Sequence, residues 1–118
     1  MAAPSTPKVD ANNPMDANAV DVLPAYPGGM DALARFLKKN LQTPDELQND
    51  ETVSVRIKFV VGYNGKLQRF IAEQQGREIY NKEVIRVLKK MPDWIPGKAK
   101  GENVSVYYAI PVKFVISD

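Results

Sequence analysis

The chain has 118 residues, and its 16 lysines and arginines exceed its 14 aspartates and glutamates by a net charge of only +2. So small an excess does not indicate a nucleic-acid or anionic-membrane partner. The sequence has no cysteine and no histidine, which excludes disulfides and thiolate metal sites and removes the commonest general base and metal ligand. No apolar run approaches the roughly 20 residues that cross a membrane. These totals predict one globular domain with a tail.

The tail is predicted from composition. Residues 1–25 hold four of the nine prolines, together with small polar residues and few large apolar side chains. Such a segment buries too little apolar surface to offset the entropy lost on ordering. We therefore expect a flexible linker over residues 1–25 and a folded domain over residues 26–118.

The domain begins with a turn signal, Tyr26-Pro27-Gly28-Gly29, after which apolar residues recur at helical spacing. The spacing predicts a helix from about Met30 to Leu41. Its apolar positions are Met30, Leu33, Ala34, Phe36, Leu37 and Leu41. Thr43-Pro44-Asp45-Glu46 then has the N-cap, proline and capping-box glutamate of a helix start, and predicts one short turn ending near Asn49.

Two strands are predicted next. Apolar residues alternate with polar ones from Val53 to Val61, the pattern of a half-buried strand. Asn64-Gly65 follows, which is the strongest short hairpin signal. The second strand should run from Leu67 to about Gln74, and its irregular alternation predicts a bulge near Gln68–Arg69.

A second long helix is predicted after the hairpin, capped by Asn81 and stopped by Pro92. Its apolar stripe is Tyr80, Val84, Val87, Leu88 and Met91. Trp94, the only tryptophan, is expected to fill the core at the helix exit. Residues 98–103 are expected to form a polar loop.

The last strand is predicted over Val104–Ile116. Seven apolar residues share one parity and can line one continuous face: Val104, Val106, Tyr108, Ile110, Val112, Phe114 and Ile116. Pro111 indicates an edge strand, because proline cannot donate to a ladder. Such an edge is either blunted by Pro111 and Lys113 or kept open for a partner.

The order of elements predicts an α+β fold. A hairpin followed by a helical crossover places the third strand beside the first. We expect a three-stranded antiparallel sheet in the order 2-1-3, with the helices packed on one face and the last strand at an edge.

In this order and spacing, the chain over about residues 26–116 resembles the C-terminal domain of TonB, as found in Bacteroidetes energy transducers. The motifs that carry the resemblance are Tyr26-Pro27-Gly28-Gly29, Val60-Val61 through Asn64-Gly65-Lys66-Leu67, Val84 to Met91, Trp94-Ile95-Pro96-Gly97-Lys98 and Ile110-Pro111-Val112-Lys113-Phe114. Two positions depart from the family pattern. Thr43-Pro44 stands where Tyr-Pro is common, and Gln74-Gln75-Gly76 where many members have a Ser-Gly turn.

The resemblance implies a function. Family members bind the N-terminal box peptide of a TonB-dependent outer-membrane transporter as an added strand, and an inner-membrane motor supplies the force. It implies a periplasmic domain whose full-length protein is anchored in the inner membrane, where it meets the motor proteins through an N-terminal anchor. Strand addition relies on backbone hydrogen bonds. The expected peptide-binding residues are Val104, Ser105, Val106, Tyr107, Tyr108, Ala109, Ile110, Val112, Lys113, Phe114 and, after the first helix, Gln42.

Two other classes of function compete with this interpretation. A related periplasmic interaction module of a sensor or scaffold, not coupled to transport, would share the fold, since fold does not fix function. An enzyme is disfavoured because the sequence lacks histidine, cysteine, a glycine-rich phosphate loop and metal-ligand spacing. We expect no catalysis, no cofactor, no metal, no small-molecule ligand and no nucleic-acid partner.

Overall fold

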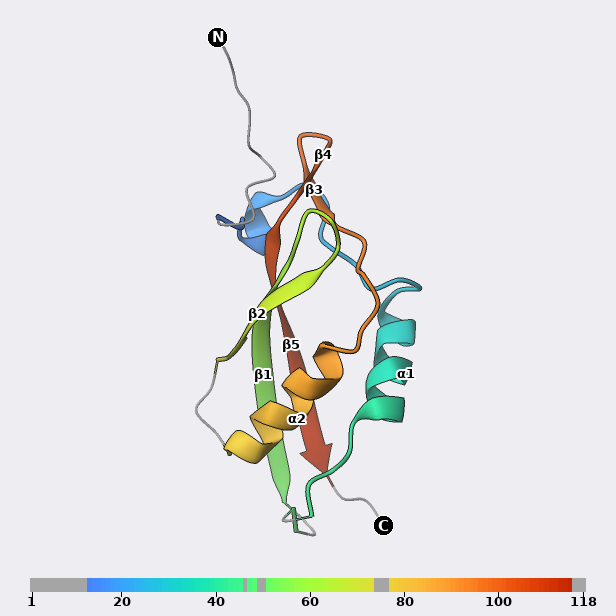
Figure 1. Ribbon diagram of the computed structural model, residues 1–118, viewed down its shortest axis with the longest axis vertical. Coiled ribbons are helices and arrows are strands. Elements are labelled where there is room, and N and C mark those ends of the chain that lie inside the picture. The colour runs from blue at the N-terminus through green and yellow to red at the C-terminus, as the bar shows by residue number, and fades with distance from the viewer. Residues whose placement is uncertain (1–12, 46, 49–50, 74–76, 116–118) are drawn as a thin grey trace.

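A three-stranded antiparallel sheet is the centre of the fold. The computed structural model describes residues 13–45, 47–48, 51–73 and 77–115. The strands β1 (Thr52–Val61), β2 (Leu67–Ala72) and β5 (Val106–Val115) pair in the order β2-β1-β5 (Figure 1). The predicted order is therefore confirmed, with the first strand central and the last strand at an edge.

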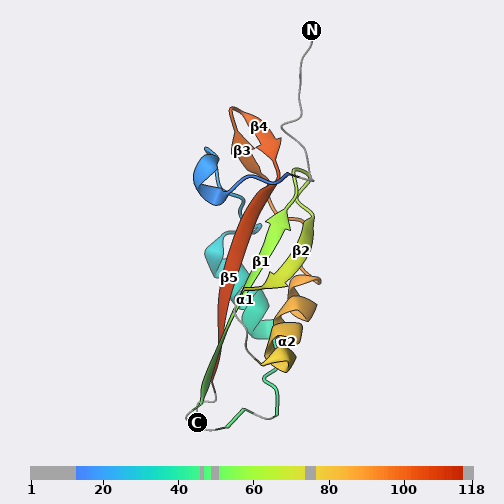
Figure 2. The same cartoon turned by 90° about the vertical axis from the view of Figure 1, so that its left-hand side faces the viewer.

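Two helices, α1 (Met30–Asn40) and α2 (Glu78–Leu88), cover one face of this sheet. Figure 2 looks onto the other face, and α1 lies behind β5 there. The apolar parity of each long strand turns toward the helices, as the alternation predicts. The buried residues that form this core from the two long strands and the helices are Val55, Ile57, Phe59, Val61, Ile110, Val112, Phe114, Leu33, Tyr80, Val84 and Leu88.

The hairpin between β1 and β2 has both predicted features. Its turn is closed by the Gly62 N–H, which donates to the Lys66 carbonyl at 2.8 Å. The pairing shifts between Lys58↔Ile71 and Val60↔Gln68, so two residues of β2 lie opposite one of β1. Arg69, in this bulge, has a φ of 59°. The bulge lets Phe70 pack against the core while Ile71 stays exposed.

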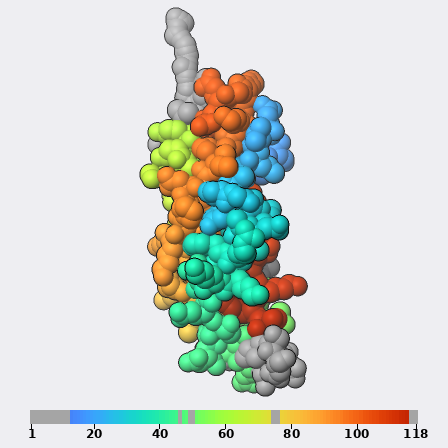
Figure 3. Space-filling view, turned by 90° about the vertical axis from the view of Figure 1, so that its right-hand side faces the viewer, coloured from blue at the N-terminus to red at the C-terminus, as the bar shows by residue number. Residues whose placement is uncertain are grey.

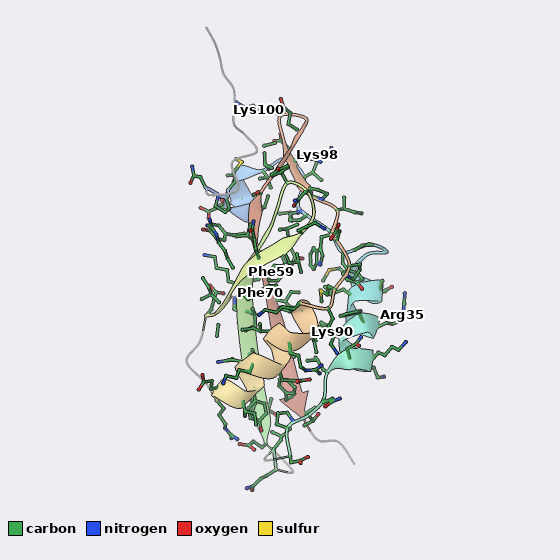
Figure 4. The ribbon with its side chains drawn as sticks, viewed as in Figure 1. Arg35, Phe59, Phe70, Lys90, Lys98 and Lys100 are labelled. Carbon is green, nitrogen blue, oxygen red and sulfur yellow. The ribbon has the colours of Figure 1, made fainter. Side chains whose placement is uncertain are left out.

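Trp94 fills the core, as predicted from its place after the helix. It is 3% exposed, and its ring meets those of Tyr26, Phe59 and Tyr108 at centroid distances of 5.8, 5.6 and 5.2 Å. Edge-on contacts of this kind are favourable for aromatic rings. Phe59 also packs on Phe70, at 5.8 Å (Figure 4). The cluster joins the turn before α1 to β1, β2 and β5.

Several local predictions were wrong. The second long helix begins at Glu78 rather than after an Asn81 cap, and it ends at Leu88, before Pro92. Residues 98–103 are not a loop: β3 (Gly97–Ala99) and β4 (Glu102–Val104) form a two-stranded hairpin, which carries Lys98 and Lys100 (Figure 4). The hairpin can form because Lys100 and Gly101 both adopt a positive φ, which a tight hairpin turn requires.

The segment around Thr43–Asp45 contains the predicted turn, in which the Leu47 N–H donates to the Pro44 carbonyl at 3.1 Å. The capping residue Glu46 and the expected end at Asn49 lie outside the described residues. Leu47 is buried in the core, so its side chain is what fixes this connection.

Residues 13–25 attach to the folded domain, although their composition predicted a linker. This segment, here called the N-terminal strap, contains the short turn η1 (Ala17–Ala19) beside the start of β5 (Figures 1 and 2). It forms isolated bridges Met15↔Val106, Val22↔Lys98 and Ala25↔Ile95. The division into linker and domain at residue 25 stays a prediction. The bridges show that composition alone misses backbone pairing.

The approach of the β1–β2 turn to Trp94 yields a stability prediction. Gly65 has a φ of 85°, and a Cβ there would lie 2.2 Å from the Trp94 carbonyl oxygen. Gly101 has nearly the same φ, 80°, but nothing within 4 Å. We expect Gly101→Ala to lower the free energy of unfolding by about 1 kcal/mol, and Gly65→Ala by roughly 3 kcal/mol or more, since it adds a clash to the same strain. Urea unfolding of both variants measures this, and equal losses would contradict it.

Candidate peptide-binding edge

The outer side of β5 carries backbone groups that no strand of the sheet uses. In an antiparallel strand each residue points its N–H and C=O to one side, and neighbouring residues alternate. The Tyr107 N–H points away from β1, because it donates to the Met15 carbonyl at 2.9 Å. Ala109, Pro111, Lys113 and Val115 therefore face outward as well. We call the outward backbone groups of residues 107–115 the acceptor edge.

Pro111 fits this edge without loss to the sheet. It lies opposite Arg56, whose own carbonyl accepts from the Glu73 N–H on the β2 side at 2.9 Å. The Arg56–Pro111 pair is thus one of the pairs that exchange no hydrogen bonds. The donor that proline lacks would have pointed outward, to any added strand.

An apolar hollow of about 230 Å³ runs beside the acceptor edge. It is lined by one face of α1 and by the middle of β5: Met30, Leu33, Ala34, Leu37, Tyr108, Ala109, Ile110 and Pro111. Met30 is 66% exposed, and Ala34 is also exposed, so two of the apolar positions predicted for this helix lie outside the core. The sequence signal for this hollow was the apolar stripe of α1, which is wider than the surface that one face of the sheet covers. In Figure 3, α1 and the exposed side of β5 lie next to each other.

The structure divides the predicted site residues by the direction of their backbone. Of these, Tyr107, Ala109 and Lys113 belong to the acceptor edge. Their neighbours on the other parity, which point their backbone groups toward β1, are Val106, Tyr108, Ile110, Val112 and Phe114. Tyr108 and Ile110 also line the hollow.

Val104 and Ser105 were expected within the long strand, but the strand is broken at Ser105. Val104 belongs to β4 and pairs with Gly97. Ser105 is buried, and its hydroxyl accepts from the Tyr63 N–H at 3.1 Å. Its side chain therefore fixes the β1–β2 turn. The Ser105 carbonyl, which accepts from the Met15 N–H, faces the outer side.

Gln42 lies at a different place, where the end of α1 is held against α2. Its N–H donates to the Glu83 carboxylate at 2.7 Å, and the same carboxylate pairs with Arg86 at 2.7 Å. Arg86 in turn donates to the Asn40 carbonyl at 3.2 Å, in the last turn of α1. The hydrogen bond from Arg86 is the main reason why the pKa of Glu83 lies below its usual value, and the hydrogen bond from Gln42 adds to it. Burial acts in the opposite direction. This group positions α1 and does not line the hollow at β5.

The described residues contain no group of three or more acidic, histidine or cysteine side chains placed to hold a metal ion. Within the same residues, no helix has the length and apolarity of a membrane span.

The fold and its exposed strand define a class: a small α+β interaction domain with an antiparallel sheet, helices on one face and one long strand at the edge. The family described as Gram-negative bacterial TonB protein C-terminal matches residues 44–116, more than half of the chain, and the chain belongs to this family. Domains of this family are in general periplasmic parts of energy transducers that interact with outer-membrane transporters. No curated protein and no solved structure matches the chain.

The Glu83 group gives a pH prediction. The folded-state pKa of Glu83 lies below its ordinary value of 4.5. The ionised carboxylate therefore stabilises the fold fully above the unfolded-state pKa, and this contribution is lost as pH falls through the folded-state pKa. We expect Glu83→Gln to be less stable than the parent chain near neutral pH, with the difference shrinking below about pH 4.5.

Urea unfolding at several pH values measures this difference. Glu78→Gln is the matched control on the same helix, because the Glu78 side chain is 80% exposed and its ion pair with Lys82 spans 3.8 Å. Exposed pairs contribute little. A Glu83→Gln difference that stays constant from neutral to acid pH would contradict the assignment.

Proposed function

We propose that this domain binds an extended segment of an outer-membrane transporter as an added strand along the acceptor edge and transmits force to it for nutrient uptake. The observation that carries the proposal is the apolar hollow lying beside unused backbone groups of β5. Strand addition needs both features, since backbone bonds provide affinity and pockets for alternate side chains provide preference.

The partner's side chains follow from the two faces of the sheet. Alternate residues of an added strand would point to the helix-covered face, where the hollow is lined by Met30, Leu37 and Ile110. Apolar side chains suit these positions, because they remove exposed apolar surface from water. The other residues would lie on the open face near the exposed Lys113, where polar or acidic side chains fit.

By extension from the family, the proposal has three further parts: the full-length protein is anchored in the inner membrane, it contacts the motor proteins there, and this domain lies in the periplasm. A sensor or scaffold module would use the same edge without coupling to transport. Nutrient uptake in cells that lack the gene separates the two roles: unchanged uptake through the peptide-binding transporters would leave the sensor or scaffold role.

Two substitutions on the acceptor edge are predicted to change peptide affinity in opposite directions. Ala109→Pro removes an outward N–H and should weaken binding, whereas Pro111→Ala supplies the missing outward N–H and should strengthen it. One hydrogen bond is worth about 0.5–1.5 kcal/mol net, so each change should be roughly 2- to 10-fold in Kd. The probes are synthetic peptides that cover the N-terminal periplasmic segments of outer-membrane transporters from the source genome, titrated by calorimetry.

Val115→Ala is the matched control, because it truncates an exposed side chain on the same parity of β5, outside the hollow, and leaves every backbone donor in place. Thermal melting of each variant confirms folding before the titration. The proposal fails if folded Ala109→Pro and Pro111→Ala bind the peptides as the parent chain does.

A further inference from the structure

The acceptor edge is already occupied at one end by the chain's own N-terminal strap. Met15 lies parallel to β5, donating its N–H to the Ser105 carbonyl and accepting from the Tyr107 N–H, both at 2.9 Å. These are the two hydrogen bonds that one residue of an added parallel strand would make. Met15 therefore has the position of a first partner residue.

The remaining strap is held more firmly than Met15. The Asp21 and Val22 N–H groups donate to the Lys98 carbonyl at 2.8 and 3.1 Å. The Lys98 N–H donates to the Val22 carbonyl at 2.9 Å. The Asp21 carboxylate accepts from the Lys100 N–H at 2.7 Å. Gly97 lies so close to the strap that a Cβ at Gly97 would be 2.9 Å from the Val22 carbonyl oxygen.

The short turn η1 separates these attachments from Met15. Residues 13–16 can therefore leave β5 while residues 21–25 stay in place. Releasing this segment costs the two Met15 hydrogen bonds and the contacts of its half-buried side chain, a small local opening.

A partner has reason to take this position. Beyond Tyr107, the outward donors of β5 are interrupted at Pro111, so Tyr107 and Ala109 are the two successive donors on its first half. The strap also walls this part of the edge, because Ala17 and Leu23 line a hollow of about 470 Å³ together with Tyr107 and Ala109. An added strand that uses the Tyr107 donor must displace Met15.

We propose that residues 13–16 are a built-in competitor of the partner strand, and that a transporter segment pairs with Tyr107 by displacing Met15. This inference rests on the proposed function. Because the competitor is tethered to the same chain, it acts at high effective concentration and lowers the apparent affinity by the fraction of molecules in which it is closed.

The test uses the full chain and the transporter peptides described above. Met15→Pro removes the N–H that binds the Ser105 carbonyl and should open the strap, so the peptides should bind roughly 2- to 10-fold more tightly. Asn18→Ala is the matched control. It truncates an exposed side chain in η1 that lines neither hollow and leaves every backbone N–H of the strap in place.

Amide hydrogen exchange of the unchanged chain gives a second, independent measurement. At saturating peptide, the Met15 amide should lose its protection while the Tyr107 amide keeps its own. If the peptides bind parent and Met15→Pro chains equally and the Met15 amide keeps its protection, the competitor is disproved and the proposed function stands. If the peptides bind neither chain, the proposed function fails and the competitor with it.

Discussion

The antiparallel register between β1 and β5 is the constraint on which the rest of the structure depends. Its pairs run without a break from Thr52↔Val115 to Val61↔Val106. Because backbone direction alternates strictly along a strand, this one register decides which β5 groups are consumed by the sheet and which face outward. A shift of one residue would turn the apolar parity away from the helices and direct Pro111 at β1, where its missing donor would break the ladder. Core and acceptor edge are thus fixed together.

The aromatic cluster around Trp94 fixes the position of α1 relative to the paired strands. Tyr26 comes from the turn before α1, Phe59 from β1 and Tyr108 from β5, and each packs on Trp94. The cluster holds the start of α1 beside the middle of β5, while Arg86 and Glu83 hold its other end. Anchored at both ends, α1 keeps Met30 and Ala34 next to the edge strand, although neither is buried. The hollow depends on these two anchors.

Much of this fold follows from local sequence signals. Alternation located β1 and the last strand, Asn64-Gly65 located the hairpin, and Pro111 indicated the edge, because each signal reports a constraint within a few residues. What the sequence could not supply depends on contacts between distant segments. The Ser105 hydroxyl interrupts the last strand by bonding Tyr63, the β3–β4 hairpin is buttressed by the strap, and Asn81 lost the capping role because the helix starts earlier, with Tyr80 buried against Phe114. For the candidate site, the strand was predicted, but the direction of each N–H depended on the register.

The strap also bears on how force and binding relate under the proposed function. A pull from the N-terminal side reaches Met15 before Asp21 and Val22, because the chain passes these attachments in that order. Each attachment consists of a few hydrogen bonds at a separate point of the strap, whereas β5 is held to β1 along its full length. Tension would therefore remove the competitor from Tyr107 long before it disturbed the strand that holds the partner. Under the proposed function, the transmitted force would therefore also favour the bound state, since a pulled chain could not return to the edge that the transporter segment would occupy.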